Sequence, residues 1–188
     1  MLAVGMAPEK LPTIDEMLEQ GIAEEDLPEA GALLWPDSVI EIDPDTDDIV
    51  WQWRVWDHLI QNHDATLPNF GDPAQHPERI DINYRGQRFL GDWQHANAIA
   101  YNPELDQIAL SLRNFSEIWV IDHSTTMAEA ATNQGGNSGM GGNLLYRWGN
   151  PEAYSQGTRD DQVLFRQHDV HWIPPGLPGA GNLLIFNN

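Results

Sequence analysis

The sequence contains no cysteine and very few basic residues, and each absence excludes classes of protein. Without thiols the chain cannot form disulfides, thiolate metal sites or a cysteine nucleophile. Nine Lys and Arg residues stand against 29 Asp and Glu residues, which gives a formal net charge of −20. A protein of this charge repels nucleic acids and anionic membranes, so we expect neither as a partner.

Long apolar runs are also absent. No stretch approaches the roughly 18 residues that a membrane span requires, so we expect no membrane insertion. No charged segment precedes an apolar one at the start of the chain, so no signal peptide is visible. Hydrophobic residues still make up 41% of the 188 residues, which is enough for the core of a single domain.

Trp, Gly and Pro are abundant, with 8, 16 and 13 residues, and this composition is typical of short strands joined by many turns. One helix is predicted over residues 13–21, where Thr13 and Glu16 fit a capping box. Alternating apolar residues predict the strands. Their ranges are 2–6, 38–42, 49–56, 96–101, 107–112, 117–121, 144–148, 168–173 and 183–186.

The strands form repeated units, because similar His-led segments at His95 and His168 each open a hairpin. Repeated four-stranded antiparallel units are typical of β-propeller blades. We therefore expect one all-β domain over 1–188, a partial β-propeller with about two blades' worth of strands. Its parts are the end of one blade with a helical insertion (1–56), a long excursion (57–92), a complete blade (93–148), and a linker with the start of the next blade (149–188).

Two blades are too few to close a ring, so we expect the chain to be a fragment. Unpaired strand edges at its two ends would favour association with further copies of the chain. A homo-oligomer is therefore among the expected states.

The register of the first hairpin places a histidine opposite an arginine. If Tyr101 faces Gln107 across the turn, His95 lies opposite Arg113 at the far end. In the second hairpin, Ile173 facing Asn182 sets His168 opposite Asn187.

In a propeller the first strand of each blade lines the central channel, so His95 and His168 are expected to point toward one axial site. Two imidazoles and the Arg113 guanidinium would form a cationic spot that can bind a sulfate or phosphate group. Histidine also acts as an acid, a base or a nucleophile near neutral pH. The alternative is that each histidine only caps a strand by hydrogen bonding.

The other histidines give weaker signals. His58 and His63 either line the mouth of a site or hold the long excursion in place. His123 follows a strand and fits a turn or cap, and His171 is expected to be structural because an odd offset separates it from His168. The acidic turn 43–47 only loosely matches a calcium loop, and no metal-binding spacing is present, so we expect no metal.

Several phrases of the sequence resemble the bacterial aryl-sulfate sulfotransferases. Two of them are the stretch 92–97, which contains the W-x-H-x-N phrase, and the stretch 167–173, which begins with the Q-H phrase. The likeness extends from about residue 30 to the end of the chain. The other phrases are 35–38, 55–59, 101–108, 110–126, 145–151 and 176–182.

This resemblance implies a six-bladed propeller that moves a sulfuryl group from a phenolic sulfate donor to a phenol acceptor. The family does not use the nucleotide donor of the eukaryotic cytosolic enzymes, and no cofactor is expected. It implies a ping-pong cycle through a sulfated histidine, with the nucleophilic histidine and an arginine lying beyond residue 188. It also implies a periplasmic or secreted protein.

The family phrases assign His95 and His168 to binding and polarising the sulfuryl group. We expect these two as catalytic residues and a further set as substrate-binding residues. That set is Arg113, Asn97, His58 and Asn187.

Two other functional classes remain open. One is a non-catalytic propeller that binds a ligand or a protein. The other is a quinone-dependent propeller dehydrogenase, which the Trp content suggests, although the absence of a vicinal cysteine pair weighs against it.

Overall fold

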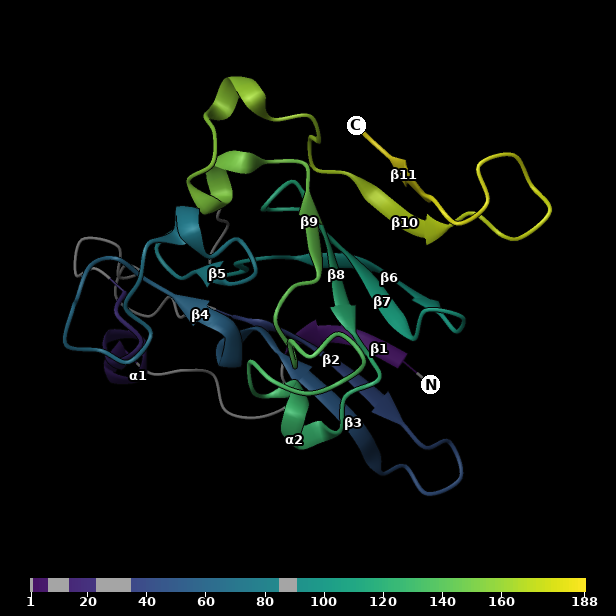
Figure 1. Ribbon diagram of the computed structural model, residues 1–188, viewed down its shortest axis with the longest axis horizontal. Helices are drawn as coiled ribbons and strands as arrows, with labels where there is room; N and C mark the ends of the chain where they lie inside the picture. Colours follow the sequence, from purple (N-terminus) through teal and green to yellow (C-terminus); the bar gives the residue numbers. More distant parts are fainter. Residues whose placement is uncertain (1, 7–13, 23–34, 85–90) are drawn as a thin grey trace.

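The computed structural model describes residues 2–6, 14–22, 35–84 and 91–188 (Figure 1). Within these ranges the protein is mostly β, with short helical segments. The strands are β1 (Leu2–Met6), β2 (Asp37–Ile42), β3 (Ile49–Arg54), β4 (Leu59–Ile60), β5 (Ile80–Asp81), β6 (Ala96–Asn102), β7 (Gln107–Leu112), β8 (Glu117–Asp122), β9 (Tyr146–Trp148), β10 (His168–Trp172) and β11 (Leu183–Phe186). The helices are α1 (Ile14–Glu19) and α2 (Met127–Ala130), and 3-10 turns are η2 (Val55–His58), η3 (Pro73–Gln75), η4 (Pro151–Tyr154) and η5 (Arg159–Asp161).

The predicted helix and strands are all present, with shifted ends. Helix α1 confirms the helix expected over 13–21, while the cap proposed at Thr13 lies outside the described residues. The strand expected over 49–56 ends at Arg54, where the chain enters the 3-10 turn η2. In the described part of the chain, no helix is both long and apolar enough to cross a membrane.

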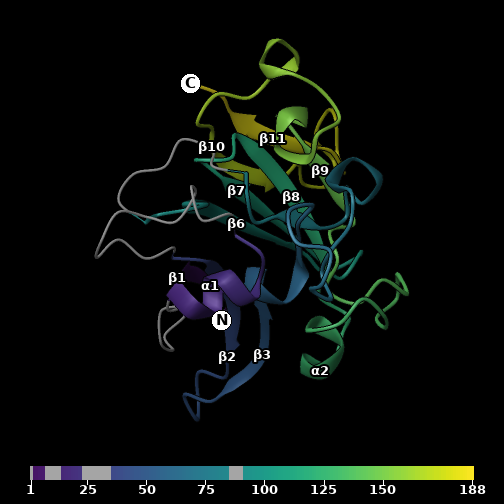
Figure 2. The same ribbon diagram turned by 90° about the vertical axis from the view of Figure 1, so that its left-hand side faces the viewer.

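Three antiparallel sheets form the body of the molecule (Figure 2). Their strand orders are β1-β2-β3, β6-β7-β8-β9 and β10-β11, and a short parallel pair joins β4 to β5. The order β6-β7-β8-β9 is the up-and-down arrangement predicted for a complete blade. Closure into a ring stays a prediction.

The four-stranded sheet packs on both faces, because side chains along a strand alternate between its faces. In β7, Ile108 and Leu110 join the core shared with Trp53 of the first sheet, whereas Ala109 joins a second apolar cluster with Val170 of β10. The four-stranded sheet therefore lies between the other two. This stacking sets the position of β10 relative to β6.

In the first hairpin the observed register differs from the predicted one by one residue. Asn102, and not Tyr101, pairs with Gln107. The Asn102 side chain accepts hydrogen bonds from the backbone N–H groups of Glu104 and Leu105 at 3.0 and 3.1 Å, which closes a turn one residue tighter than expected. A β-bulge between Ala96 and Ala98 then restores the alignment farther along the strand.

The second hairpin has the predicted register near its turn and departs from it at its far end. Trp172 pairs with Leu183 as expected, but a bulge between His168 and His171 places His168 opposite Phe186. The expected pairing of His168 with Asn187 is therefore wrong.

A buried ion pair ties the long 57–92 segment to the four-stranded sheet. Arg147 on β9 contacts Glu117 at the start of β8, with Nε donating to Oε1 at 3.0 Å, and both side chains are almost fully buried. Arg147 also donates to the carbonyl oxygens of Pro77 and Arg79 at 3.3 and 3.0 Å. The Trp119 indole donates to the other Glu117 oxygen at 2.9 Å. One guanidinium thus satisfies a buried carboxylate and two loop carbonyls.

Replacing Arg147 with Met should leave the Glu117 carboxylate buried without a cation. We expect the free energy of unfolding, measured by urea denaturation at neutral pH, to fall by about 3–5 kcal/mol. The half-exposed Arg54–Asp57 pair provides the control, since Arg54→Met should cost less than about 1 kcal/mol. Equal losses in the two variants would contradict the anchoring role of Arg147.

Candidate functional site

Strands β6 and β10 begin next to each other (Figure 1, Figure 2). The Asn97 side-chain amide in β6 donates a hydrogen bond to the carbonyl oxygen of Gln167 at 2.9 Å. Asn97 follows His95 by two residues, and Gln167 directly precedes His168. The sequence-predicted pair is therefore carried by adjacent strand beginnings from two different sheets.

Gln167 fixes the start of β10 to the four-stranded sheet. Its side chain is completely buried. Its Nε2 lies within hydrogen-bond distance of Ser111 Oγ (3.2 Å), Leu112 O (3.2 Å) and Glu117 O (2.8 Å). Because these acceptors belong to β7 and β8, the backbone next to His168 cannot move without breaking buried hydrogen bonds.

Backbone strain occurs at one candidate histidine and directly after the other. His95 has φ of 55°, and Asp169, which follows His168, has φ of 57°. Non-glycine residues rarely occupy this left-handed region, and here both lie beside β-bulges. Such strain and such bulges concentrate at functional sites. Five other non-glycine residues of the described chain have similar φ values, so the strain is consistent with these two positions without singling them out.

His95 is accessible from solvent and is held by a carboxylate. Its Nδ1 is hydrogen-bonded to Asp92 Oδ2, and 42% of its side chain is exposed. Arg113 lies opposite His95 as predicted, since its backbone N–H donates to the His95 carbonyl at 3.1 Å. The Arg113 guanidinium is half-buried and donates to Asn114 Oδ1 at 3.2 Å.

A second carboxyl group lies behind His95. Asp37 Oδ2 accepts a hydrogen bond from the Ala96 backbone N–H at 2.8 Å. Burial raises the pKa of Asp37 to about 6; the nearby Asp92 carboxylate also raises it, whereas the Ala96 N–H and His95 lower it. Asp37 is thus a carboxyl group that exchanges its proton near neutral pH, next to His95.

The sequence interpretation assigned no role to Asp37 or Asp92. Asp37 lies inside the family phrase at 35–38 and Asp92 directly precedes the W-x-H-x-N phrase at 93–97, so only the position of Asp92 near a candidate histidine was visible in the sequence. Their convergence was not, because residues 37 and 96 meet only through folding.

His168 is partly buried, with Nδ1 3.4 Å from the Asn188 side-chain amide. Asn187, predicted to bind substrate, uses its side-chain amide for hydrogen bonds within the protein. It accepts from the Phe165 N–H at 2.8 Å and donates to the Val163 carbonyl at 3.1 Å. Its described contacts therefore hold the preceding loop.

His58 lies in the core. Its side chain is completely buried, stacks on Trp53 with ring centroids 5.5 Å apart, and places Nε2 2.8 Å from the Ala130 carbonyl. Burial lowers the pKa of His58. This location favours the loop-holding alternative over substrate binding, because an enclosed ring cannot reach a ligand.

His123 contacts two carboxylates, with Nδ1 2.8 Å from Asp106 and Nε2 3.2 Å from Glu41. Both of its ring nitrogens are occupied, in agreement with a structural role. His171 is 3.6 Å from the Asp169 carboxylate at the protein surface.

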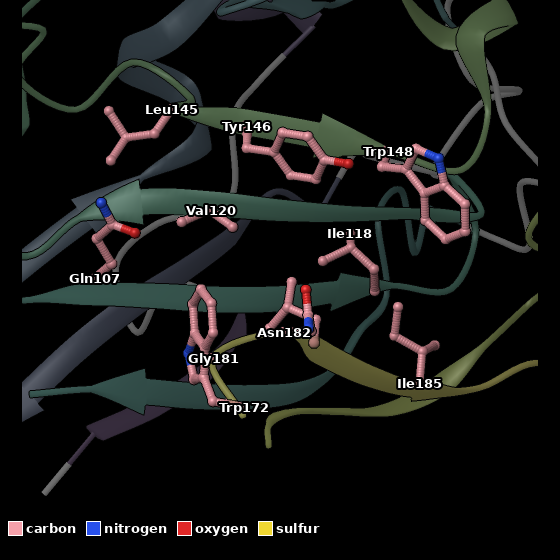
Figure 3. A pocket seen from close by; sticks show the side chains of 11 residues that line it. Gln107, Ile118, Val120, Leu145, Tyr146, Trp148, Trp172, Gly181, Asn182 and Ile185 are labelled. Atoms are coloured by element: carbon pink, nitrogen blue, oxygen red, sulfur yellow. The ribbon is translucent and has the colours of Figure 1, made fainter. Parts of the chain in front are cut away.

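A cavity of about 540 Å³ lies elsewhere, between β8–β9 and the β10–β11 hairpin (Figure 3). Its walls are aliphatic and aromatic with two amide side chains, Gln107 and Asn182; Tyr146 and Trp148 lie on one side and Trp172 on the other. Neither His95 nor His168 lines it, and no ionisable group other than the Tyr146 hydroxyl does. The cavity therefore does not match the anion site.

The raised pKa of Asp37 predicts a specific pH dependence of stability. An Asp carboxyl with an ordinary value of 3.8 and a folded value of about 6 binds its proton more tightly in the folded state. Its contribution to stability is present below about pH 4 and is lost as the pH rises toward 6. We expect Asp37→Asn to gain up to about 3 kcal/mol relative to the wild type between pH 4 and pH 7, measured by urea unfolding.

The control is Asp64→Asn, at an exposed carboxyl whose pKa the Thr66 N–H and hydroxyl lower. Its stability relative to the wild type should not rise over this range. A flat difference for Asp37→Asn would show that this carboxyl does not hold its proton.

Comparison with known proteins identifies one family. The model described as Arylsulfotransferase (ASST) matches residues 22–188. Among curated proteins and among solved structures, no significant match was found.

Proposed function

Since this chain belongs to the arylsulfotransferase family, we propose that it acts in the transfer of a sulfuryl group from a phenolic sulfate ester to a phenol. The observation that carries this proposal is the adjacency of the strand beginnings that bear His95 and His168. Family membership supports the aryl sulfate and phenol as substrates, and a periplasmic or extracellular location is proposed on the same ground.

The two histidines are proposed to stabilise the negative charge on the sulfuryl oxygens. The sulfuryl group carries oxygens whose negative charge must be balanced as the ester bond breaks. Imidazole N–H groups at a fixed position can donate hydrogen bonds to these oxygens, and removing one such donor typically lowers turnover about 10²–10³-fold. Charge-assisted donors are especially effective in a protein whose net charge of −20 otherwise repels anions.

The proposed cycle has two half-reactions through a sulfated histidine. In the first, a histidine nitrogen attacks sulfur, the sulfur–oxygen bond of the donor breaks, and the departing phenolate takes a proton from a neighbouring imidazole. In the second, the acceptor phenol gives its proton to that imidazole, its oxygen attacks sulfur, and the nitrogen–sulfur bond breaks. His95 and His168 are assigned to holding the sulfuryl oxygens and to this proton transfer.

Family membership is also the ground on which we propose a propeller architecture. Support comes from the four-stranded β6–β9 sheet, which is covered by a sheet on each face. Among the described residues β11 has a neighbour on one side only, and Leu184 and Phe186 on it are exposed. This edge is where a further sheet, or a second copy of the chain, would pack.

Transfer of a sulfuryl group from para-nitrophenyl sulfate to a phenol tests the function, assayed on a protein extended past residue 188 to include the nucleophilic histidine that the family resemblance implies. We expect His95→Asn and His168→Asn each to lower turnover by about 100-fold or more, because each removes a donor to the sulfuryl oxygens. His76→Asn is the matched control, since the His76 ring is exposed and its one described hydrogen bond is with Glu78.

Exposure to donor without acceptor should add the mass of one sulfuryl group to a histidine. Full turnover in both site variants would contradict the assignment of His95 and His168. Absence of both transfer and labelling in the wild type would favour the non-catalytic binding platform.

A further inference from the structure

Asp92 holds His95 through one ring nitrogen and leaves the other available. The one hydrogen bond that the structure describes for the His95 ring joins Nδ1 to Asp92 Oδ2. The two side chains are 42% and 35% exposed, so a ligand in solvent can reach the ring from its Nε2 side. His95 is therefore both oriented and accessible.

The turn that presents Asp92 is rigid. The Asp92 carbonyl accepts from the Asn114 side-chain amide at 2.6 Å, and the Asn114 backbone N–H donates to Gln94 O at 3.0 Å. Trp93, which lies between Asp92 and Gln94 in the sequence, is fully buried, and its indole donates to Tyr84 O at 3.0 Å. The carboxylate therefore reaches the ring from a fixed backbone.

Among the described residues, two other histidines hydrogen-bond to carboxylates, and both lack this arrangement; the Asp169 carboxylate near His171 is 3.6 Å from its ring, beyond hydrogen-bond distance. His123 has both ring nitrogens occupied by carboxylates. His76 contacts Glu78 at 2.9 Å on an exposed loop, with a negative φ of −129°. Only His95, among these three, combines a single carboxylate contact with a strained backbone.

Asp92 determines where the ring carries its hydrogen. An ionised carboxylate only accepts hydrogen bonds, so the contact requires the hydrogen on Nδ1. When the ring takes up a second proton, Nε2 becomes a donor and the carboxylate balances the new positive charge. Asp37 does not share this role: its Oδ2 accepts from the Ala96 N–H, and the structure describes no hydrogen bond between its carboxyl and the His95 ring.

We propose that Asp92 is a positioning residue for His95, which keeps one hydrogen on Nδ1, so that Nε2 is the atom that takes up and releases the exchanged proton and, once protonated, donates to the sulfuryl oxygens. This inference rests on the proposed function. Asp92 acts through His95 and does not touch the substrate.

The first test reads the tautomer of His95 by ¹⁵N NMR of the imidazole rings in the full chain, with His95→Asn identifying the signal. We expect the neutral ring to carry its hydrogen on Nδ1 in the wild type, and Asp92→Asn to abolish that preference. A wild-type ring with its hydrogen on Nε2 would overturn the inference without any variant. Glu78→Gln, which changes the contact to His76, should leave the His95 signal unchanged.

The second test is a double-mutant cycle on sulfuryl transfer. Because Asp92 acts through His95, Asp92→Asn should lower turnover, and Asp92→Asn combined with His95→Asn should be no slower than His95→Asn alone. Additive losses would show that Asp92 acts independently of His95 and would contradict the inference.

The outcomes separate this inference from the function on which it rests. Loss of the Nδ1 preference in Asp92→Asn, together with full turnover in His95→Asn, would leave Asp92 as a positioning residue and remove the catalytic role of His95. An inactive His95→Asn variant, together with an unchanged tautomer and turnover in Asp92→Asn, would do the opposite.

Discussion

The buried side-chain amide of Gln167 is the contact on which the candidate site depends. It joins the start of β10 to β7 and β8, while the Gln167 carbonyl accepts from Asn97 in β6. The residues flanking these bonds are His168 on one side and His95 on the other. A shift of the β10–β11 hairpin would therefore leave buried polar groups unpaired, at a typical cost of about 1–3 kcal/mol for each group. Buried hydrogen bonds therefore fix the backbone positions of the two histidines relative to each other.

Glu117 connects this contact to the rest of the fold. Its backbone carbonyl accepts from Gln167, and its side chain accepts from Arg147, which in turn holds the carbonyls of the 57–92 segment. The long excursion, the four-stranded sheet and the β10 strand thus meet at one buried residue. The Glu117 carboxylate at this position is buried together with the Arg147 guanidinium, so its charge is balanced inside the core.

Much of the fold follows from the sequence, because alternating apolar residues and Asn-Pro or Gly-rich turns mark each strand. The pairing of His95 with Arg113 was confirmed although the assumed register was wrong over most of the hairpin. The bulge beside Asn97 compensated for the shift at the turn. The pairing of His168 with Asn187 was wrong because nothing compensated for the bulge at Asp169. A bulge changes the alternation of only a few residues, so periodicity cannot reveal it.

The candidate site was only partly predictable. Its histidines were visible as repeated strand beginnings, but Asp37 reaches Ala96 across 59 positions of sequence. Such a contact depends on how two sheets stack. His58 shows the reverse case, since its position at the start of the long excursion allowed either substrate binding or loop holding, and the structure buries it in the core against Trp53.

Titration of the chain with inorganic sulfate, followed through the ¹⁵N signals of its imidazole rings, tests the central claim most directly. If His95 and His168 form one anion site, both rings respond with the same dissociation constant, and His95→Asn weakens the response of His168. Responses with different affinities, or a response of one ring alone, would contradict the shared site.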